Sequence, residues 1–268
     1  MRSGTIRTGI GGWTFEPWDE TFYPADLPKK RQLEYAASKL TTIEVNGTFY
    51  RSQKPETFGA WAEQVPDGFV FSLKAPRYAV NRKVLAEGGE SIQRFVDSGI
   101  AELGEKLGPL LWQFAATKQF DPDDFAAFLK LLPAKAGAIP LRHVVEPRHQ
   151  SFACPEFVDL CRKAGAAIVM AESDDYPQIA DVTADFVYLR LQKGDETIPT
   201  AYPAQALDRW AERARIWAAG GQPDDLQRAD PDHPAPNRPR DVFVYFIRSG
   251  KPRAPHAAMA LMDRLRDS

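Results

Sequence analysis

The chain has 268 residues, of which 44% are hydrophobic, and its 34 Lys and Arg against 36 Asp and Glu leave a formal charge of −2. This length can bury a large core without a metal or a disulfide, and the mixture of apolar and oppositely charged residues argues against global disorder. The near-zero charge gives no support to a protein that coats DNA or RNA, although a local basic patch is compatible with it.

The ends of the chain and its cysteines bear on its location. No stretch approaches the about 20 apolar residues of a membrane helix, and Met1–Gly4 leads into polar sequence without a signal-peptide core. We therefore expect a cytoplasmic protein that does not bind a membrane. Cys154 and Cys161 lie seven residues apart in a helical pattern, a rise of about 10.5 Å that exceeds the about 7 Å reach of a disulfide. Both are predicted to be packed free thiols, with a catalytic or zinc-binding cysteine as the alternative.

Short apolar runs alternate with longer amphipathic runs along the chain. The short runs predict eight strands, over Ile6–Ile10, Thr41–Asn46, Phe69–Lys74, Pro109–Phe114, Leu141–Glu146, Ala166–Ala171, Phe186–Leu191 and Val242–Ile247. The amphipathic runs predict helices over Lys30–Leu40, Pro55–Gln64, Ser91–Lys106, Pro122–Leu132, Pro155–Ala164, Pro203–Ala218 and His256–Arg266. Eight such repeats match an α/β fold, a (β/α)8 TIM-like barrel formed by a single domain over residues 1–268.

An open, doubly wound sheet is the main alternative fold. It would usually have a glycine-rich phosphate loop between its first strand and its first helix. Here the first strand ends in Gly9-Ile10-Gly11-Gly12-Trp13, and no helix follows at once. The dinucleotide-binding fingerprint therefore fails in its context, and no cofactor is predicted.

One segment departs from the alternation. Residues Ala219–Arg240 contain five prolines and mixed charges, with almost no large apolar residues. This composition predicts an exposed, flexible insertion before the last strand. A lid over the substrate is the functional alternative.

The alternation of side chains along each strand indicates which polar residues face into the barrel. Apolar residues occupy one face of the second strand and should meet the helices, which turns Glu44 and Asn46 inward. The same parity turns Lys74 inward on the third strand and Arg190 inward on the seventh. All four lie toward the carboxyl ends of their strands, the face on which barrel active sites lie.

Further polar residues share this placement. The full set is Glu44, Asn46, Lys74, Gln113, Glu146, Arg148, His149, Glu172 and Arg190. Burying isolated charges is costly, so these groups must pair with each other or meet a charged ligand. The purely structural alternative is a self-compensating network, for example Glu44 with Arg190 and Glu146 with Lys74. So many charges in one place favour a functional site.

Aromatic residues follow the same strands. They are Trp13, Phe15, Trp18, Phe22, Tyr23, Phe49, Tyr50, Tyr78 and Phe152. Aromatic walls stack on sugars or bases, but they also simply pack loops. Trp13 and Tyr50 are the two rings that we predict to contact a substrate, with loop packing as the alternative for each.

Several of these motifs resemble one known family. The run Ile43-Glu44-Val45-Asn46-Gly47-Thr48-Phe49-Tyr50-Arg51 is similar to the second-strand motif of the YecE-like family, a domain of unknown function. Further motifs that fit are Gly12-Trp13, Trp18, Phe22-Tyr23-Pro24, Phe69–Lys74 with Pro76, Leu107-Gly108-Pro109 to Gln113, Glu146-Pro147-Arg148-His149 with Ser151-Phe152, and Tyr188-Leu189-Arg190. The resemblance covers nearly the whole chain and implies a TIM-type barrel, but it implies no particular activity.

The chain departs from the family pattern at a few positions. Pro147 replaces an apolar side chain between the family's Glu and Arg-His, and the segment 219–240 is long. Ile247 and Arg248 stand where the family usually has asparagines at the end of the last strand, and His256 stands where a later asparagine is usual. If the family binds a ligand through those asparagines, that contact is altered or lost here.

Two chemistries are disfavoured by the composition of the site. A metal-dependent barrel enzyme needs converging His, Asp and Glu ligands, and His149 is the one well-placed histidine among four. Neighbouring Lys and Arg also argue against a cation held by Glu44, Glu146 and Glu172, so no metal is predicted. A glycosidase would need two carboxyls flanking the bond, whereas Glu44 and Glu146 come from nonadjacent strands and Gln113 stands where an acid is common.

An anion-binding site uses the most residues with the fewest contradictions. Lys74, Arg148 and Arg190 would hold a phosphate or carboxylate, with arginine giving forked contacts. A Schiff base on Lys74 is an alternative role that requires a lowered pKa.

Within such a site we predict acid–base roles for Glu146 and His149, with Glu44 in support. Asn46 and Gln113 would orient the ligand. The sequence thus predicts an uncharacterised barrel enzyme, hydrolase- or lyase-like, acting on a small anionic or sugar-like substrate. The alternative is a barrel that binds or processes nucleic acid, with bases stacked on the aromatic residues; the absence of net basic charge disfavours it.

Overall fold

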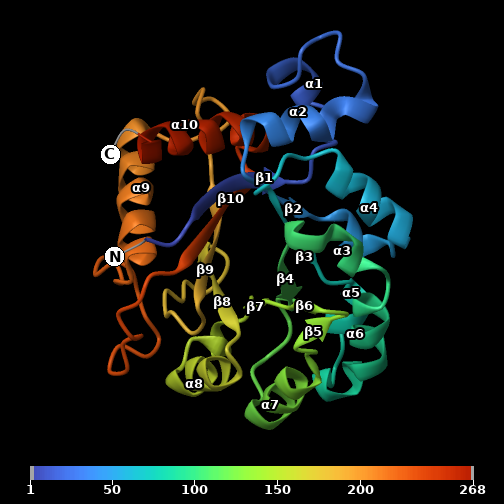
Figure 1. Cartoon of the computed structure of the whole chain (residues 1–268). Coiled ribbons are helices and arrows are strands. Elements are labelled where there is room, and N and C mark those ends of the chain that lie inside the picture. Colours follow the sequence, from blue (N-terminus) through green and yellow to red (C-terminus); the bar gives the residue numbers. More distant parts are fainter. Residues whose placement is uncertain (1–2, 267–268) are drawn as a thin grey trace.

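A computed structural model describes residues 3–266 and shows a closed barrel of eight parallel strands (Figure 1). The strands are β1 (Ile6–Gly11), β2 (Thr42–Val45), β3 (Val70–Lys74), β4 (Leu107–Gln113), β7 (His143–Glu146), β8 (Ala167–Glu172), β9 (Phe186–Lys193) and β10 (Asp241–Ser249). They pair in chain order, and β10 closes the barrel on β1 with Ile6 opposite Val242. All eight predicted strands are present, and the prediction of a (β/α)8 barrel is confirmed.

Helices surround the barrel between most successive strands (Figure 1), whereas residues 173–185, between β8 and β9, form none. The longer ones are α2 (Gln32–Lys39), α4 (Pro55–Glu63), α6 (Gly89–Val96), α7 (Pro122–Leu131), α8 (Pro155–Ala164), α9 (Ala204–Ala219) and α10 (Ala254–Arg266). The short elements are α1 (Trp18–Thr21), α3 (Gly47–Tyr50), α5 (Arg77–Val80), the 3-10 turns η1 (Lys29–Arg31), η2 (Leu85–Gly88), η3 (Ile100–Lys106), η4 (Gln150–Phe152) and η5 (Lys251–Arg253), and a hairpin of β5 (Lys135–Ala136) with β6 (Ile139–Pro140). No helix within residues 3–266 is long and apolar enough to span a membrane.

Local signals account for most helix boundaries. Pro122 and Pro155 stand at the first helical positions of α7 and α8, where a missing N–H costs nothing, and Asp121 caps α7 by accepting from a backbone N–H. The helix predicted over Ser91–Lys106 is wrong in its second half. Gly99, with a φ of 102°, separates α6 from the 3-10 turn η3 because this left-handed conformation ends a helix.

The barrel has two apolar layers, and strand parity separates them. Ile43 packs outward in the larger core with the helices, whereas Tyr188, Phe243 and Tyr245 pack with one another inside the barrel. The glycine run of β1 serves this packing: a Cβ on Gly9 would lie 1.9 Å from the carbonyl oxygen of Thr42 on β2. The run therefore permits close strand approach, which agrees with the failure of the phosphate-loop pattern.

The segment before the last strand lies at the amino-terminal end of the barrel. Helix α9 ends at Ala219, and residues 221–240 form neither helix nor strand before β10 begins. Its backbone is held in place: the Asp181 carboxylate accepts from the N–H groups of Ala229 and Asp230 at 2.6 and 3.0 Å, and the Arg240 side chain is buried. The irregular insertion is confirmed, and its flexibility stays a prediction. It enters β10 from the amino-terminal end of the barrel, and the lid alternative also stays untested.

Candidate active site at the carboxyl ends of the strands

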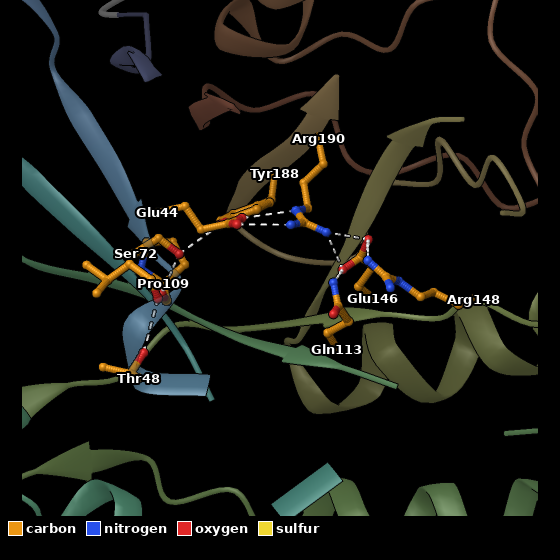
Figure 2. Close-up of polar contacts among 10 residues, drawn as sticks. Glu44, Thr48, Ser72, Pro109, Gln113, Glu146, Arg148, Tyr188 and Arg190 are labelled. Atoms are coloured by element: carbon orange, nitrogen blue, oxygen red, sulfur yellow. Dashed lines mark hydrogen bonds and ion pairs between the residues drawn. The ribbon is translucent and has the colours of Figure 1, made fainter. Parts of the chain in front are cut away.

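One arginine organises the charged residues at the carboxyl ends of the strands (Figure 2). Arg190 on β9 donates from Nε and Nη2 to the two oxygens of Glu44 on β2, at 3.0 Å each. Its Nη1 donates to both oxygens of Glu146 on β7, at 2.7 Å each. We refer to Glu44, Glu146 and Arg190 as the glutamate–arginine network. Its two negative charges exceed its one positive charge, so further donors are needed around it.

Those donors come from neighbouring strands. The Tyr188 hydroxyl donates to Glu44 Oε2 at 2.8 Å and also contacts the Ser72 hydroxyl at 2.8 Å. The Gln113 amide donates to Glu146 Oε2, and Arg148 Nη2 lies 3.6 Å from Glu146 Oε1 (Figure 2). Both glutamates are therefore buried with cationic or hydrogen-bonding partners on their oxygens.

The electrostatics favour the ionised forms of Glu146 and Arg190. Burial alone would raise the pKa of Glu146, but Arg190, Arg148 and the Gln113 amide hold it below its usual value. The pKa of Arg190 is raised, because its two glutamates outweigh the effect of burial. Of the two ion pairs in the self-compensating alternative, Glu44 with Arg190 forms. The pair of Glu146 with Lys74 does not, because Arg190 takes both oxygens of Glu146.

Lys74 is left apart at the end of β3. Its side chain is buried to 6% exposure, and its Nζ lies 4.0 Å from the centre of the Phe49 ring. Within residues 3–266 the ammonium makes no hydrogen bond and no ion pair. Burial and the charge of Arg190 lower the pKa of Lys74 to about 8, although Glu44 and Glu146 act in the opposite direction.

A cleft of about 600 Å³ opens above the network. Arg190, Asn46, Trp13 and Tyr50 line it, and their role in binding a substrate stays a prediction. Trp13 packs edge-on against Trp61 with the ring centres 5.2 Å apart, whereas Tyr50 is 70% exposed. The aromatic wall therefore combines a largely covered ring with a largely exposed one.

The cleft is lined by cationic side chains and by buried donors that lack partners. Arg148, Arg190, Arg248 and Lys251 line it, and no carboxylate does so within residues 3–266. Two of its buried donor atoms, Gln192 Nε2 and Arg148 Nε, have no hydrogen-bond partner in this part of the chain. Such donors cost free energy unless a ligand or water accepts from them.

Other predicted residues lie elsewhere. His149 does not line the cleft: its Nδ1 contacts the Ser151 hydroxyl at 2.8 Å and the Ser151 N–H at 3.2 Å, which holds the turn after β7. Glu172 accepts from Tyr202 at 2.6 Å and from Trp210 at 3.3 Å, on the outer side of the barrel.

The positions that depart from the family pattern divide between two places. Ile247 and Arg248 line the cleft, and Arg248 pairs with Asp175 at 2.6 Å. His256 lies on α10, with its ring centre 6.4 Å from that of Phe22, and does not line the cleft.

Some cleft residues were not among the predicted site residues. Gln192 follows Arg190 by two positions on β9, so strand parity places it inward as well. Tyr176 stacks on Arg148 at 4.4 Å, and Lys251 lies 4.3 Å from the Phe15 ring. Tyr176 lies in a loop and Lys251 begins the 3-10 turn η5, and strand parity gives no signal for either.

A metal centre finds no support in the described part of the chain. No group of three His, Cys, Asp or Glu residues there is arranged to hold a metal ion. Cys154 and Cys161 are both free, as their spacing predicts.

An eight-stranded parallel barrel with a polar cleft at its carboxyl end defines a TIM-type barrel protein. Residues 7–268 match the family described as "Protein of unknown function DUF72", so the chain belongs to that family. It is 29% identical to the "UPF0759 protein YecE" of Escherichia coli K12 over 147 residues, 55% of this chain and 50% of that protein. The chain thus spans about half the length of the curated relatives it matches, and the resemblance to the YecE-like family is confirmed.

Solved structures of the same family share the fold. The DUF72 family protein of Thermotoga maritima MSB8 is 20% identical with a TM-score of 0.72, and the match covers 98% of this chain and 100% of that chain. The DUF72 family protein of Enterococcus faecalis V583 is 19% identical with a TM-score of 0.72, covering 98% of this chain and 96% of that chain. At these identities the likeness concerns the fold alone.

Proposed function

We propose that this chain binds a small anionic ligand, a carboxylate or a phosphate ester, in the cleft at the carboxyl ends of the strands and acts on it as an enzyme. The observation that carries the proposal is the pair of unpartnered buried donors, Gln192 Nε2 and Arg148 Nε, in a cleft lined by four cations and no described carboxylate. An anion offers several lone pairs, which accept hydrogen bonds from the unpartnered donors, and a negative charge, which pairs with the cations of the cleft.

The cations are positioned before any ligand arrives. Glu44 and Glu146 hold the Arg190 guanidinium from two sides, and the bonds to them use four of its five N–H donors. Tyr176 supports the Arg148 guanidinium at 4.4 Å. Rigid donors lose little conformational entropy on binding, so this arrangement favours recognition of a planar or tetrahedral anion.

The roles of the predicted acid–base residues change accordingly. Glu146 is fully buried, tied to Arg190, and has a lowered pKa, so it remains ionised and is a poor proton donor near neutral pH. His149 stands outside the cleft. We assign Glu146 and Glu44 to positioning Arg190, with Gln113 supporting Glu146. Trp13 and Tyr50 provide apolar faces for a sugar or another ring carried by the ligand.

Thermal denaturation with a panel of ligands tests this function. The panel contains inorganic phosphate, glucose 6-phosphate, citrate, a short oligonucleotide and, as the uncharged control, glucose. A ligand at about 100 times its Kd adds about 2.7 kcal/mol, which raises Tm by several degrees for a chain of this size. We expect the small anions to raise Tm and glucose to leave it unchanged.

Variants connect the shift to the cleft. Arg148→Ala and Gln192→Met should abolish the anion-dependent shift, whereas Arg209→Ala, on the exposed face of α9, should keep it. An equal shift by glucose, no shift by any small anion, or a full shift in Arg148→Ala would contradict the proposal. A shift by the oligonucleotide alone would instead favour the nucleic-acid alternative.

A further inference from the structure

Lys74, at the carboxyl end of β3, is a buried cation that the glutamate–arginine network does not neutralise. It ends β3, and Arg190 and Arg148 are among the charges close enough to act on it. The two buried glutamates lie nearby, but both oxygens of Glu44 and both of Glu146 already accept from Arg190. The Lys74 ammonium consequently lies near two guanidinium groups and forms no ion pair with a carboxylate within residues 3–266.

The immediate surroundings of the amine are aromatic. The centre of the Phe49 ring lies 4.0 Å from the Lys74 Nζ. The Phe49 ring also packs against the ring of Tyr50, with the ring centres 5.1 Å apart, and Tyr50 lines the cleft. A ring face stabilises an ammonium only partly when compared with a carboxylate. Lys74 keeps 6% of its surface exposed, and its Nζ is not among the buried polar atoms that lack a partner. Lys74 itself does not line the cleft, and Phe49 and Tyr50 connect its amine to the cleft wall.

We propose that Lys74 is the nucleophile of this site and forms an imine with a carbonyl substrate that carries an anionic group. The proposal rests on the anion site proposed above, because Arg148 and Gln192 would hold the anionic end while Lys74 meets the carbonyl carbon. The shared chemistry is a carbonyl one or two bonds from a carboxylate or a phosphate ester, as in a 2-oxo acid or a phosphorylated aldehyde. Lys74 thereby becomes a catalytic residue, whereas Glu44 and Glu146 remain positioning residues.

The step balances without any other reagent. The neutral amine forms a bond from nitrogen to the carbonyl carbon, and the carbonyl π electrons move to oxygen, which takes a proton from water. The nitrogen then returns a proton to the hydroxide left by that water, which gives a neutral carbinolamine. The hydroxyl group takes one proton from the solvent and leaves as water while the nitrogen lone pair forms the carbon–nitrogen double bond, so amine, carbonyl and one proton give a protonated imine and one water with no electron gained or lost. The protonated imine withdraws electrons from the neighbouring carbon, which suits lyase-type bond cleavage or formation.

The surroundings of Lys74 supply the neutral amine that this step requires. With its pKa at about 8, about 10% of the amine is neutral at pH 7, against about 0.03% for a lysine at 10.5. The difference is about 300-fold in the concentration of the nucleophile. A desolvated lysine beside other cations is a known way to activate this side chain.

Reductive trapping on the whole chain tests the inference. The protein is incubated at pH 7 with sodium cyanoborohydride and either pyruvate, glycolaldehyde phosphate or acetone, and the adduct is mapped by peptide mass spectrometry. Cyanoborohydride reduces the imine to a stable secondary amine, so the modified lysine is identified directly in the wild-type protein. We expect a single adduct on Lys74 with at least one anionic carbonyl compound, and at least about 100-fold less with acetone, since acetone lacks the anion.

The arms of the experiment separate the possible substrates and the two proposals. An adduct with pyruvate alone identifies 2-oxo acids, and one with glycolaldehyde phosphate alone identifies phosphorylated aldehydes. Labelling should disappear in Lys74→Arg and persist in Lys83→Arg, which changes an exposed lysine; the rate should rise as pH passes through about 8. If Lys74→Arg does not fold, the wild-type map and pH profile still decide.

Failure of this inference is distinguishable from failure of the anion site. Anion-dependent thermal shifts without any Lys74 adduct would overturn the nucleophile and leave the binding function standing. An adduct that acetone forms equally well, or that appears mainly on other lysines, would also overturn it. The absence of both adduct and thermal shift would remove the anion site together with the nucleophile.

Discussion

Arginines surround a hollow at each end of the barrel, but the groups that pair with these arginines differ between the two ends. The hollow at the amino-terminal end is the larger, at about 1020 Å³ against about 600 Å³ for the cleft. There Arg7 and Arg142 share Asp241 at 3.7 and 2.9 Å, and Arg240 donates to the backbone carbonyls of Gly220 and Pro236. These cations hold the segment before β10 and the strand ends together.

The carboxyl-terminal end combines saturated and unsatisfied groups. Arg190 takes two carboxylates, while the side chains of Lys74 and Gln192 make no hydrogen bond within residues 3–266. At the amino-terminal end Arg7 Nη1 and Arg240 Nε also lack hydrogen bonds, but each belongs to a guanidinium group that Asp241 or backbone carbonyls already hold. The two ends therefore differ in whole side chains left without partners rather than in the presence of a cavity, and this difference supports placing the proposed site at the carboxyl-terminal end.

The largest effect should come from removing the shared arginine. Arg190→Met leaves Glu44 and Glu146 buried without their main partner, and breaking a buried ion pair in this way costs about 3–5 kcal/mol of unfolding free energy. Urea denaturation at pH 7 measures the loss. The triple variant Arg190→Met, Glu44→Gln and Glu146→Gln should recover part of it, because no charge is stranded. A loss below about 1 kcal/mol in the single variant would show that the network is not desolvated.

Removing the Lys74 charge should increase the unfolding free energy, whereas removing Arg190 decreases it. The unfolded lysine keeps its proton to about pH 10.5, whereas folded Lys74 loses it at about 8, so the charged form opposes folding below pH 8. Lys74→Met should therefore stabilise the chain by about 3 kcal/mol at pH 7, from a shift of about 2.5 pH units at about 1.4 kcal/mol each. The advantage should shrink between pH 8 and 10.5, because the wild type gains stability with rising pH in that range.

Denaturation of the two proteins at pH 7 and pH 10 measures that change. Groups common to both proteins cancel in the difference. Lys83→Met, at an exposed position, serves as the matched control and should give the same small difference at both values. A Lys74→Met advantage that is absent at pH 7, or constant across this range, would show that the amine is solvated or neutralised by another group.

The smallest of the three effects belongs to the amino-terminal end. Arg240→Ala removes two hydrogen bonds to the carbonyls of Gly220 and Pro236 but strands no carboxylate. We expect a loss of about 2 kcal/mol, since each bond contributes about 1 kcal/mol net. Urea denaturation measures it, with Arg238→Ala at the exposed neighbouring position as a control near zero. A loss as large as that of Arg190→Met would mean that the two ends do not differ as described.

Local sequence patterns were enough to predict the eight strands, most of the helices and the inward direction of several polar side chains. These follow from local rules: a period of two on strands, a period near 3.6 on helices, and prolines at first helical turns. Glu44, Lys74 and Arg190 were predicted inward from that parity, and the contacts of Glu44 and Arg190 agree. The helix break at Gly99 could not be predicted from the sequence, because the backbone conformation of a glycine depends on what surrounds it.

Only the tertiary structure decided which charges meet. Glu44 and Arg190 are 146 residues apart, and Glu146 and Arg190 are 44 apart, so their contacts depend on how the barrel closes and on side-chain reach across its interior. Parity gives no direction for residues outside the strands, which is why His149 was expected in the site and Tyr176 and Lys251 were not. A self-neutralising network and an unpartnered lysine have the same inward pattern in sequence; only distances distinguish them, because Coulomb and hydrogen-bond energies depend on separation.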